Sequence, residues 1–305
     1  MRSKKVLQVF LRGGLGNQLF QYSTGLALAQ NQNQELLLRG DLLPRAEDSI
    51  GGVSRWPNQL TDFQHSGTIR TKTHQPAGKT NIVGKCMQVM RIAGDRIPGL
   101  VQRIGWLANE NTEPSIESLR APIRLINSYS PFKDLAFRNR EKLRKELNEI
   151  HEPSSEYLCL ASEIQASKAI AVHLRQGDYL NLGHIYGSSS LDFLKAAVKG
   201  LKESGDYESI WLFTDTPSAV ANDVLDFLSP QKVIGPETLP RPLENMLLMS
   251  KASGLIAANS SFSWWSALLT SEGTPVYAPY IVKARVNNFS KDAEIDRNWR
   301  SLIVP

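Results

Sequence analysis

The chain has 305 residues, enough for two domains of ordinary size, and its 41% hydrophobic and 21% charged residues are typical of a globular protein. A formal net charge of +5 suits anionic partners such as phosphates or an acidic membrane surface, but it is too small to indicate nucleic-acid binding. The two cysteines, Cys86 and Cys159, provide neither a disulfide framework nor a metal set, and no apolar run approaches about eighteen residues, so we expect a cytoplasmic protein without a membrane span.

The first half of the chain begins with a clear alternation of strand and helix and then becomes rich in loops. We expect a strand at Val6–Phe10, a helix at Asn17–Gln30, a strand at Glu35–Leu38, a loop-rich stretch over 41–120, a strand within 123–129 and a charged helix over 139–150.

The second half follows the turn-like sequence HEPSSE, which begins at His151, and alternates more regularly. Strands are expected at 169–174, 209–214, 232–235, 254–259 and 275–278, with helical patterns between most of them. Such alternation predicts an α/β fold with largely parallel sheets covered by helices on both faces. We therefore expect two Rossmann-like domains, 1–150 and 151–305, with ligands beyond the carboxyl ends of their strands.

The first strand leads into the glycine-rich turn Gly13–Asn17 at the start of a predicted helix. Glycines let the backbone approach a ligand, and the amides at a helix N-terminus favour an anion or a sugar hydroxyl. A dinucleotide fingerprint is excluded because its third glycine would fall at Leu19, and no G-K-[ST] of a P-loop follows. By itself the turn is equally consistent with a ligand site and with a plain tight turn.

His173, Arg175 and Asp178 leave the end of a predicted strand together, in the sequence HLRQGDY. Arginine offers a fixed fork of donors to phosphate oxygens and keeps its charge, while a nearby carboxylate could hold the guanidinium in place. A histidine there could bind a base or a phosphate. The alternative is a surface ion pair of Arg175 with Asp178 beside a buried His173.

The strand SIWLFT ends in a capping sequence, in which Thr214 or Thr216 could cap a helix that has Pro217 in its first turn. Asp215 could accept hydrogen bonds from guanine there. Capping alone explains this pattern equally well.

The strand GLIAAN is expected to end at Asn259, directly before a serine-rich helix start. The hydroxyls of Ser260, Ser261 and Ser263, together with free amides, could form a phosphate site. The Trp264–Trp265 pair that follows is expected to pack in the core rather than stack on a ligand.

The motifs GGLGNQLFQY, HLRQGDY and NSSFSWW, in this order, resemble those of bacterial α-1,2-fucosyltransferases, which are inverting, metal-independent enzymes of glycosyltransferase family 11. The resemblance covers Leu11–Tyr22, Val172–Tyr179, Phe213–Pro217 and Met246–Trp265. It implies a GT-B-like fold with two Rossmann-like domains facing a central cleft. It also implies GDP-β-L-fucose as the donor, a galactose-terminated glycan as the acceptor, an N-terminal domain on the acceptor side, a C-terminal domain that binds the donor, and no metal or other cofactor.

The resemblance also implies roles for individual residues. Arg175 would bind the donor pyrophosphate, His173 and Asp215 would serve the guanine, and Asn17 would face the fucose and the leaving phosphate. The implied donor-binding residues are Gly14, Gly16, Asn17, His173, Arg175, Thr214, Asp215, Asn259, Ser260, Ser261 and Phe262, and the implied catalytic residues are Arg175, Asp178 and Asn17.

One residue departs from the pattern, since Gln176 stands where related fucosyltransferases have a second arginine. We expect that second position to play a supporting role. No Asp-x-Asp occurs in the sequence, so Arg175, helix amides and serine hydroxyls would neutralise the leaving GDP. The expected reaction is direct displacement by a galactose 2-hydroxyl with inversion from β to α. Asp178 and His184 are both candidates for the general base, and the sequence does not choose between them.

Basic residues predominate between Gln64 and Ile104, where apolar and basic side chains mix in a helical style. This segment could rest on an anionic membrane surface, which would suit a lipid-linked acceptor in O-antigen or other polysaccharide biosynthesis. A helix packed on the N-terminal domain with a solvated basic face is the favoured alternative.

Three other functions compete with fucosyl transfer. A nicotinamide-dependent dehydrogenase is disfavoured by the failed fingerprint at Leu19, and a nucleic-acid module by the lack of a clustered basic and aromatic face. A catalytically weak or inactive GDP-sugar or glycan-binding protein is kept open by Gln176. Within fucosyl transfer, a different linkage also stays open, because the linkage rests on the resemblance alone.

Overall fold

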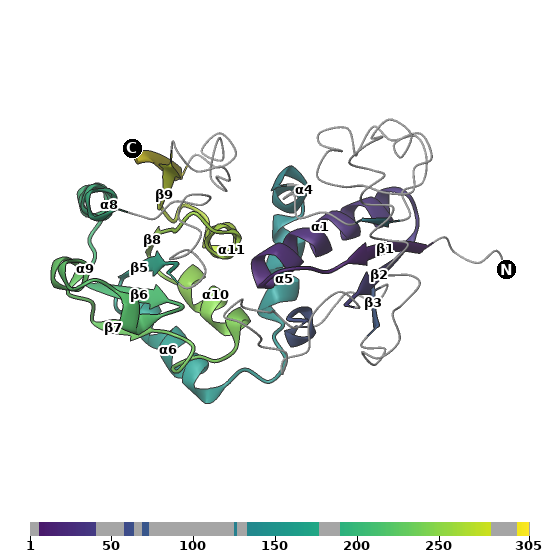
Figure 1. Ribbon diagram of the computed structural model, residues 1–305, viewed down its shortest axis with the longest axis horizontal. Helices are drawn as coiled ribbons and strands as arrows, with labels where there is room; N and C mark the ends of the chain where they lie inside the picture. Colours follow the sequence, from purple (N-terminus) through teal and green to yellow (C-terminus); the bar gives the residue numbers. More distant parts are fainter. Residues whose placement is uncertain are drawn as a thin grey trace. The chain divides into compact units, whose positions relative to one another are not determined.

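The computed structural model describes residues 6–40, 58–63, 69–72, 125–126, 133–176, 190–281 and 298–304. The chain divides into two compact units, which are residues 1–150 (unit 1) and 151–305 (unit 2). Each unit contains a parallel β-sheet flanked by helices (Figure 1).

The described residues of unit 1 form a four-stranded parallel sheet in the order β3-β2-β1-β4. Its strands are β1 (Val6–Phe10), β2 (Glu35–Arg39), β3 (Ile69–Lys72) and β4 (Leu125–Ile126). Its helices are α1 (Leu15–Asn31), the 3₁₀ turn η1 (Leu60–Asp62), α4 (Lys133–Arg138) and α5 (Arg140–Asn148). Burial alternates along β2 because successive side chains of a strand point to opposite faces.

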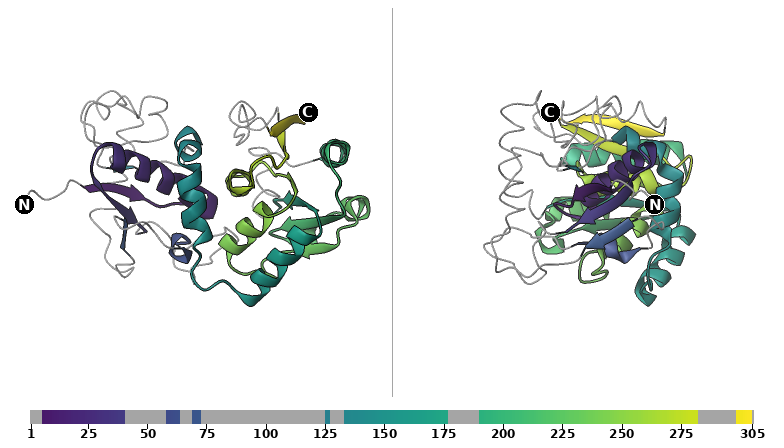
Figure 2. Two further views of the ribbon diagram at one scale, coloured as in Figure 1. Left: turned by 180° about the vertical axis from the view of Figure 1, so that it is seen from behind. Right: turned by 90° about the vertical axis from the view of Figure 1, so that its right-hand side faces the viewer.

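Helix α1 lies along β1 and β2 (Figure 2) at a separation that only glycine allows. A Cβ atom added to Gly25 would lie 2.6 Å from Cγ2 of Val9 and 2.9 Å from Cδ1 of Leu36. Real Cβ atoms do not approach carbon this closely. Gly25 therefore sets how tightly the helix covers the sheet.

In the part of unit 2 that the structure describes, six strands form a parallel sheet in the order β10-β9-β8-β5-β6-β7. Its strands are β5 (Ala169–Leu174), β6 (Ser209–Thr214), β7 (Lys232–Ile234), β8 (Gly254–Ile256), β9 (Val276–Ile281) and β10 (Trp299–Val304). Its helices are α6 (Ser155–Ala166), α8 (Leu191–Ser204), the 3₁₀ turn η3 (Pro217–Ala219), α9 (Asn222–Leu228), α10 (Pro242–Ser250) and α11 (Ser261–Leu269).

Helices cover both faces of the unit 2 sheet (Figure 1). On one face, apolar residues of α8 and α9 pack with Ile170, Val172 and Leu174 of β5 in a single hydrophobic cluster. On the other face, α10 packs against both α6 and α11. Because side chains alternate along a strand, His173 points to this second face.

In both sheets, the strands are added first on one side of the first strand and then on its other side. Numbered within unit 2, the strand order is 3-2-1-4-5-6, which is the doubly wound order of dinucleotide-binding folds. The described strands of unit 1 follow the same pattern as far as 3-2-1-4. Ligands of such sheets bind beyond the carboxyl ends of the strands where the order reverses. In unit 2 this position lies between β5 and β8.

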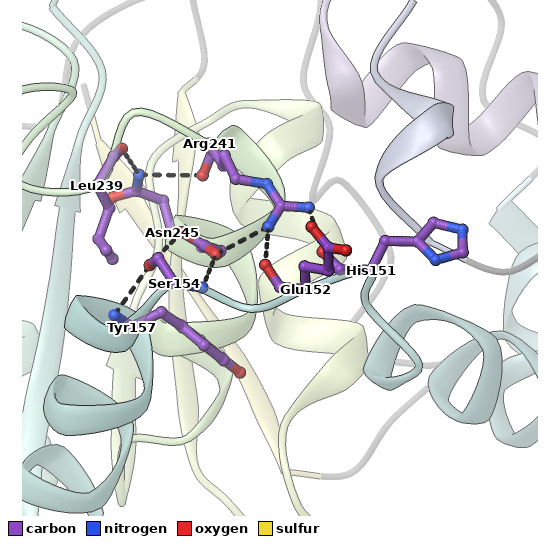
Figure 3. A network of polar contacts seen from close by, with 8 residues as sticks. His151, Glu152, Ser154, Tyr157, Leu239, Arg241 and Asn245 are labelled. Carbon is purple, nitrogen blue, oxygen red and sulfur yellow. Dashed lines mark hydrogen bonds and ion pairs between the residues drawn. The ribbon is translucent and has the colours of Figure 1, made fainter.

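A network of polar contacts attaches the first residues of unit 2 to helix α10 (Figure 3). The Arg241 guanidinium donates to the carbonyl oxygens of His151 and Glu152, at 2.9 Å and 2.8 Å. The buried carboxylate of Glu244 accepts from the peptide N–H and the hydroxyl of Ser154, at 2.8 Å and 2.9 Å, and from Arg241 at 3.1 Å. The segment 151–154 is thus held by unit 2.

Most expected elements of the described residues are present, with shifted ends. The helix expected at Asn17 begins at Leu15, and residues 155–156 of the expected turn HEPSSE already belong to α6. The stretch expected to be loop-rich contains β3, and β10 was not expected. The strand expected to end at Asn259 ends at Ile256, because the next residues turn back toward α11 and the peptide N–H of Ala258 donates to Oγ of Ser263.

Candidate functional site

The carboxyl ends of β5 and β6 and the start of α11 bring three sequence motifs of unit 2 together. Arg175 follows β5 and contacts Asp215, which follows β6. His173, near the end of β5, contacts Ser263 in the first turn of α11. These contacts lie at the reversal of strand order, where a doubly wound sheet binds its ligands.

Asp215 holds the turn that follows β5. Its Oδ2 lies 3.2 Å from Nη1 of Arg175, and its Oδ1 accepts a hydrogen bond of 2.8 Å from the peptide N–H of Gln176. The two charged side chains are 17% and 20% exposed, so the guanidinium is fixed by the carboxylate and still reaches solvent. The geometry gives Asp215 the holding role that the sequence suggested for Asp178, which lies outside the described residues.

Gln176, which the motif resemblance places where related fucosyltransferases have a second arginine, contributes its main chain to this turn. Its side-chain Oε1 is buried and accepts no hydrogen bond from the residues that the structure describes. A buried amide oxygen without a donor is costly, so a hydrogen-bond donor brought by a ligand would be favoured there.

His173 is only 5% exposed, and its Nδ1 forms a hydrogen bond with Oγ of Ser263. The imidazole also lies beside the Phe262 ring, with 5.6 Å between the centroids. Burial lowers the pKa of His173 to about 4, with help from the nearby positive charge of Arg175 and against the opposing effect of Asp215. The imidazole is therefore neutral at neutral pH.

The N-terminus of α11 is capped by the side chain of its own N-cap residue, Ser260. Ser260 is buried, and its Oγ accepts a hydrogen bond of 3.1 Å from the peptide N–H of Ser263. Ser261 is half-exposed, and its hydroxyl has no hydrogen-bond partner among the described residues, so it is better placed than Ser260 to meet a ligand. The expected packing role of Trp264 and Trp265 is confirmed, since both are fully buried.

The remaining predicted residues at these strand ends are buried. Asn259 is 2% exposed and Thr214 is 4% exposed. Oγ1 of Thr214 accepts from the peptide N–H of Thr216 at 3.2 Å, whereas the Thr216 side chain makes no capping bond to the 3₁₀ turn η3. The capping expected here is therefore a bond within the loop rather than a helix cap.

In unit 1, two buried glutamines hold the glycine turn that follows β1. Nε2 of Gln18 donates to the carbonyl oxygen of Gly13 at 2.8 Å, and Oε1 of Gln21 accepts from the peptide N–H of Arg12 at 2.9 Å. Gly13 has a φ of +68°, a left-handed conformation that favours glycine. Asn17 is half-exposed, and its side chain makes no hydrogen bond to the described residues.

Residues that act through hydrogen bonds to their neighbours were not predicted from the sequence. Gln18 and Gln21 belong to a recognised motif, and their spacing of three places both on one face of a helix, which could have indicated a shared task. Nothing in the sequence pairs Ser263 with His173, because 90 residues separate them. Asp178 and His184, the candidates for the general base, lie outside the described residues.

Among the residues that the structure describes, no cluster of three or more histidine, cysteine, aspartate or glutamate side chains is suited to hold a metal ion. In the same part of the chain, no helix combines the length and the apolar character needed to cross a bilayer.

A family model described as glycosyl transferase family 11 matches residues 122–302, which is more than half of the chain. The chain belongs to glycosyl transferase family 11. The matched range contains every site residue of unit 2 described above, whereas the glycine turn of unit 1 lies before it.

Two proteins of Escherichia coli are similar to this family 11 chain over most of its length. An α-1,2-colitosyltransferase is 26% identical over 292 residues, which cover 92% of this chain and 93% of that protein. The O-antigen biosynthesis glycosyltransferase WbnK is 24% identical over 290 residues, which cover 88% of this chain and 92% of that protein. The family 11 chain is a glycosyltransferase.

Solved structures of fucosyltransferases share its fold. NodZ α-1,6-fucosyltransferase soaked with GDP-fucose matches with a TM-score of 0.51 at 15% identity, over 88% of this chain and 93% of that one. POFUT1 in complex with GDP matches with a TM-score of 0.51 at 15% identity, over 90% of this chain and 98% of that one. The expected α/β, GT-B-like fold class is confirmed by these likenesses and by the two parallel sheets.

Proposed function

We propose that this family 11 glycosyltransferase is a galactoside 2-α-L-fucosyltransferase that uses GDP-β-L-fucose as its donor. The observation that carries the proposal is Arg175, which Asp215 holds at the strand ends where a doubly wound sheet binds its ligands. An arginine that is charged at every physiological pH and fixed in direction suits a diphosphate. The WbnK relative supports an acceptor of the O-antigen type.

In the proposed reaction, the galactose 2-hydroxyl oxygen attacks the anomeric carbon of fucose as the bond to the β-phosphate breaks, and the hydroxyl proton passes to a general base, for which Asp178 and His184 are the candidates. Negative charge then develops on GDP, and Arg175 neutralises it together with the amides at the start of α11 and the Ser261 hydroxyl. Asn17 contacts the donor sugar in this proposal. The anomeric configuration changes from β to α, and no step requires a metal.

The test is acceptor-dependent release of GDP from GDP-fucose with EDTA present, measured with a panel of galactosides. Arg175→Ala should lower kcat by roughly 10²–10³, because it removes a donor aimed at developing charge. Arg300→Ala is the matched control, since Arg300 is exposed on β10 and donates to Tyr277 Oη. Its activity should stay close to that of the wild type.

Other results would favour other functions. Tight binding of GDP-fucose without release would support a GDP-sugar-binding protein, and no binding would contradict the proposed donor. NMR analysis of the product should show substitution at the galactose 2-position, and substitution elsewhere would contradict the α-1,2 linkage.

A second candidate, transfer of a colitosyl group, is favoured by the α-1,2-colitosyltransferase relative at 26% identity. Nucleotide-activated colitose should be offered in the same assay. A kcat/KM for that donor that exceeds the value for GDP-fucose would select the second candidate.

We also propose peripheral contact of the basic segment 64–104 with anionic lipid, on the charge pattern of the sequence alone. Apart from β3, this segment lies outside the described residues. Sedimentation with anionic and with neutral liposomes tests the contact, and equal binding to both would contradict it.

A further inference from the structure

A histidine and a serine from different elements of unit 2 meet in the protein interior. His173 on β5 is 5% exposed, and Ser263 in the first turn of α11 is fully buried. Their Nδ1 and Oγ atoms are joined by a hydrogen bond. Which partner donates the proton determines which ring nitrogen of His173 is left to bind something else.

The hydrogen bonds around Ser263 settle the direction. Its Oγ accepts from the peptide N–H of Ala258 at 3.1 Å and from the hydroxyl of Ser260 at 3.2 Å. A hydroxyl has two acceptor positions and one proton. With both acceptor positions occupied, the Ser263 proton is directed to Nδ1 of His173.

A hydrogen bond in the opposite direction, from His173 to Ser263, would leave the hydroxyl proton of Ser260 without an acceptor in the described part of the chain. If Nδ1 of His173 donated to Ser263, the Ser263 hydroxyl would have to donate to Ser260. The Ser260 proton would then have no acceptor among the residues that the structure describes. A buried donor without an acceptor costs about 1–3 kcal/mol, which disfavours this arrangement.

We infer that Ser263 is a positioning residue that fixes His173 as the neutral tautomer with its proton on Nε2. If the proposed function holds, His173 then donates a hydrogen bond from Nε2 to an oxygen of the guanosine diphosphate and does not act as a base. The neutral ring fits the low pKa that burial and Arg175 give this residue.

The tautomer is tested in the free protein, so the test does not depend on the proposed function. Long-range ¹H–¹⁵N NMR of histidine-labelled wild-type protein distinguishes a protonated from an unprotonated ring nitrogen. The chain has five histidines, and the His173 signals are assigned by their loss in His173→Gln. We expect the proton on Nε2 at neutral pH, and a proton on Nδ1 would overturn the inference.

The role of Ser263 is tested by Ser263→Ala against Ser266→Ala. Ser266 is a buried serine on the same helix whose hydroxyl donates to the carbonyl oxygen of Phe262 at 3.2 Å, so it serves as the matched control. Ser263→Ala should mix the two tautomers, and Ser263→Thr should restore the wild-type signals. Unchanged His173 signals in Ser263→Ala would overturn the positioning role. If Ser263→Ala fails to fold, the wild-type spectrum still decides the tautomer.

The use of the Nε2 proton is tested by calorimetric titration with GDP. The amide nitrogen of His173→Gln can replace an Nε2 donor, whereas the shorter side chain of His173→Asn reaches only the Nδ1 position. GDP should bind to His173→Gln within about threefold of the wild type and to His173→Asn about tenfold more weakly, the loss of roughly one hydrogen bond. Equal weakening of both would overturn the donor role. Absence of GDP binding to the wild type would contradict the proposed function, and the NMR result would stand.

Discussion

At the scale of single residues, the candidate site depends on side chains that hold other side chains. Asp215 contacts both the guanidinium of Arg175 and the peptide N–H of Gln176. A carboxylate with both oxygens engaged in this way sets the direction of the arginine. Asp215 therefore acts on an anionic ligand through Arg175, in addition to any contact of its own.

Replacing Asp215 by asparagine should weaken donor binding by about tenfold, since the amide can still accept from Gln176 but no longer attracts Arg175. The donor KM in the GDP-release assay measures this. Asp226→Asn, at an exposed position on α9, is the control and should change nothing. A donor KM that stays at the wild-type value in Asp215→Asn would show that Arg175 needs no holding.

His173 should make the folded state less stable as the pH falls. Its pKa is about 4 when folded, against 6.5 for an ordinary histidine, so between these values the unfolded chain binds a proton that the folded protein does not. The free energy of unfolding is therefore unaffected by protonation of His173 above pH 6.5 and declines as the pH falls from 6.5 toward 4. In denaturant unfolding across this pH range, the free energy of unfolding should decline less steeply for His173→Gln than for the wild type. Parallel curves for the two proteins would contradict the buried neutral imidazole.

At the scale of elements, the contact of α1 with its sheet depends on Gly25. In an open helix, replacing glycine by alanine stabilises by roughly 1 kcal/mol. Here the new Cβ would lie 2.6 Å from Val9 and 2.9 Å from Leu36, so Gly25→Ala should instead lower the free energy of unfolding by about 1–3 kcal/mol. Chemical denaturation measures the change. A stabilised variant would show that the helix can move away from β1 without loss.

At the scale of the whole molecule, the chain passes from unit 1 to unit 2 at residue 151, next to a buried carboxylate. Glu244 is fully buried. The burial of Tyr157, together with the negative charge of Glu244, raises the pKa of Tyr157 to about 12. Arg241 and Ser154 satisfy the carboxylate (Figure 3). The start of unit 2 is thereby tied to the body of the same unit.

Glu244→Ala should lower the free energy of unfolding of unit 2 by about 3–5 kcal/mol, because it leaves the Arg241 charge and the Ser154 donors without their buried partner. Denaturant unfolding measures the loss, and limited proteolysis should show faster cleavage at residues 151–154. Glu237→Ala, at an exposed position, is the control. Wild-type resistance to cleavage in Glu244→Ala would contradict the holding role of this network.

Local patterns in the sequence were enough to predict the fold class and the strand ends at which polar side chains gather. Alternating apolar runs such as Val6–Phe10 and Ala169–Leu174 predicted parallel strands, because local burial follows the period of each element. Arg175 and the serines before Trp264 stood out because polar groups that follow a buried strand mark the ligand-binding edge of a doubly wound sheet.

Which of these side chains contact one another could not be predicted from the sequence and is seen only in the folded chain. The bonds of Arg175 to Asp215, of His173 to Ser263 and of Ser154 to Glu244 join residues 40 to 90 positions apart in the chain. No local pattern specifies such pairs, since they depend on strand order and register. The end of β8 at Ile256 was missed for the same reason, because the peptide N–H of Ala258, just beyond the strand, donates to the Ser263 side chain on the following helix.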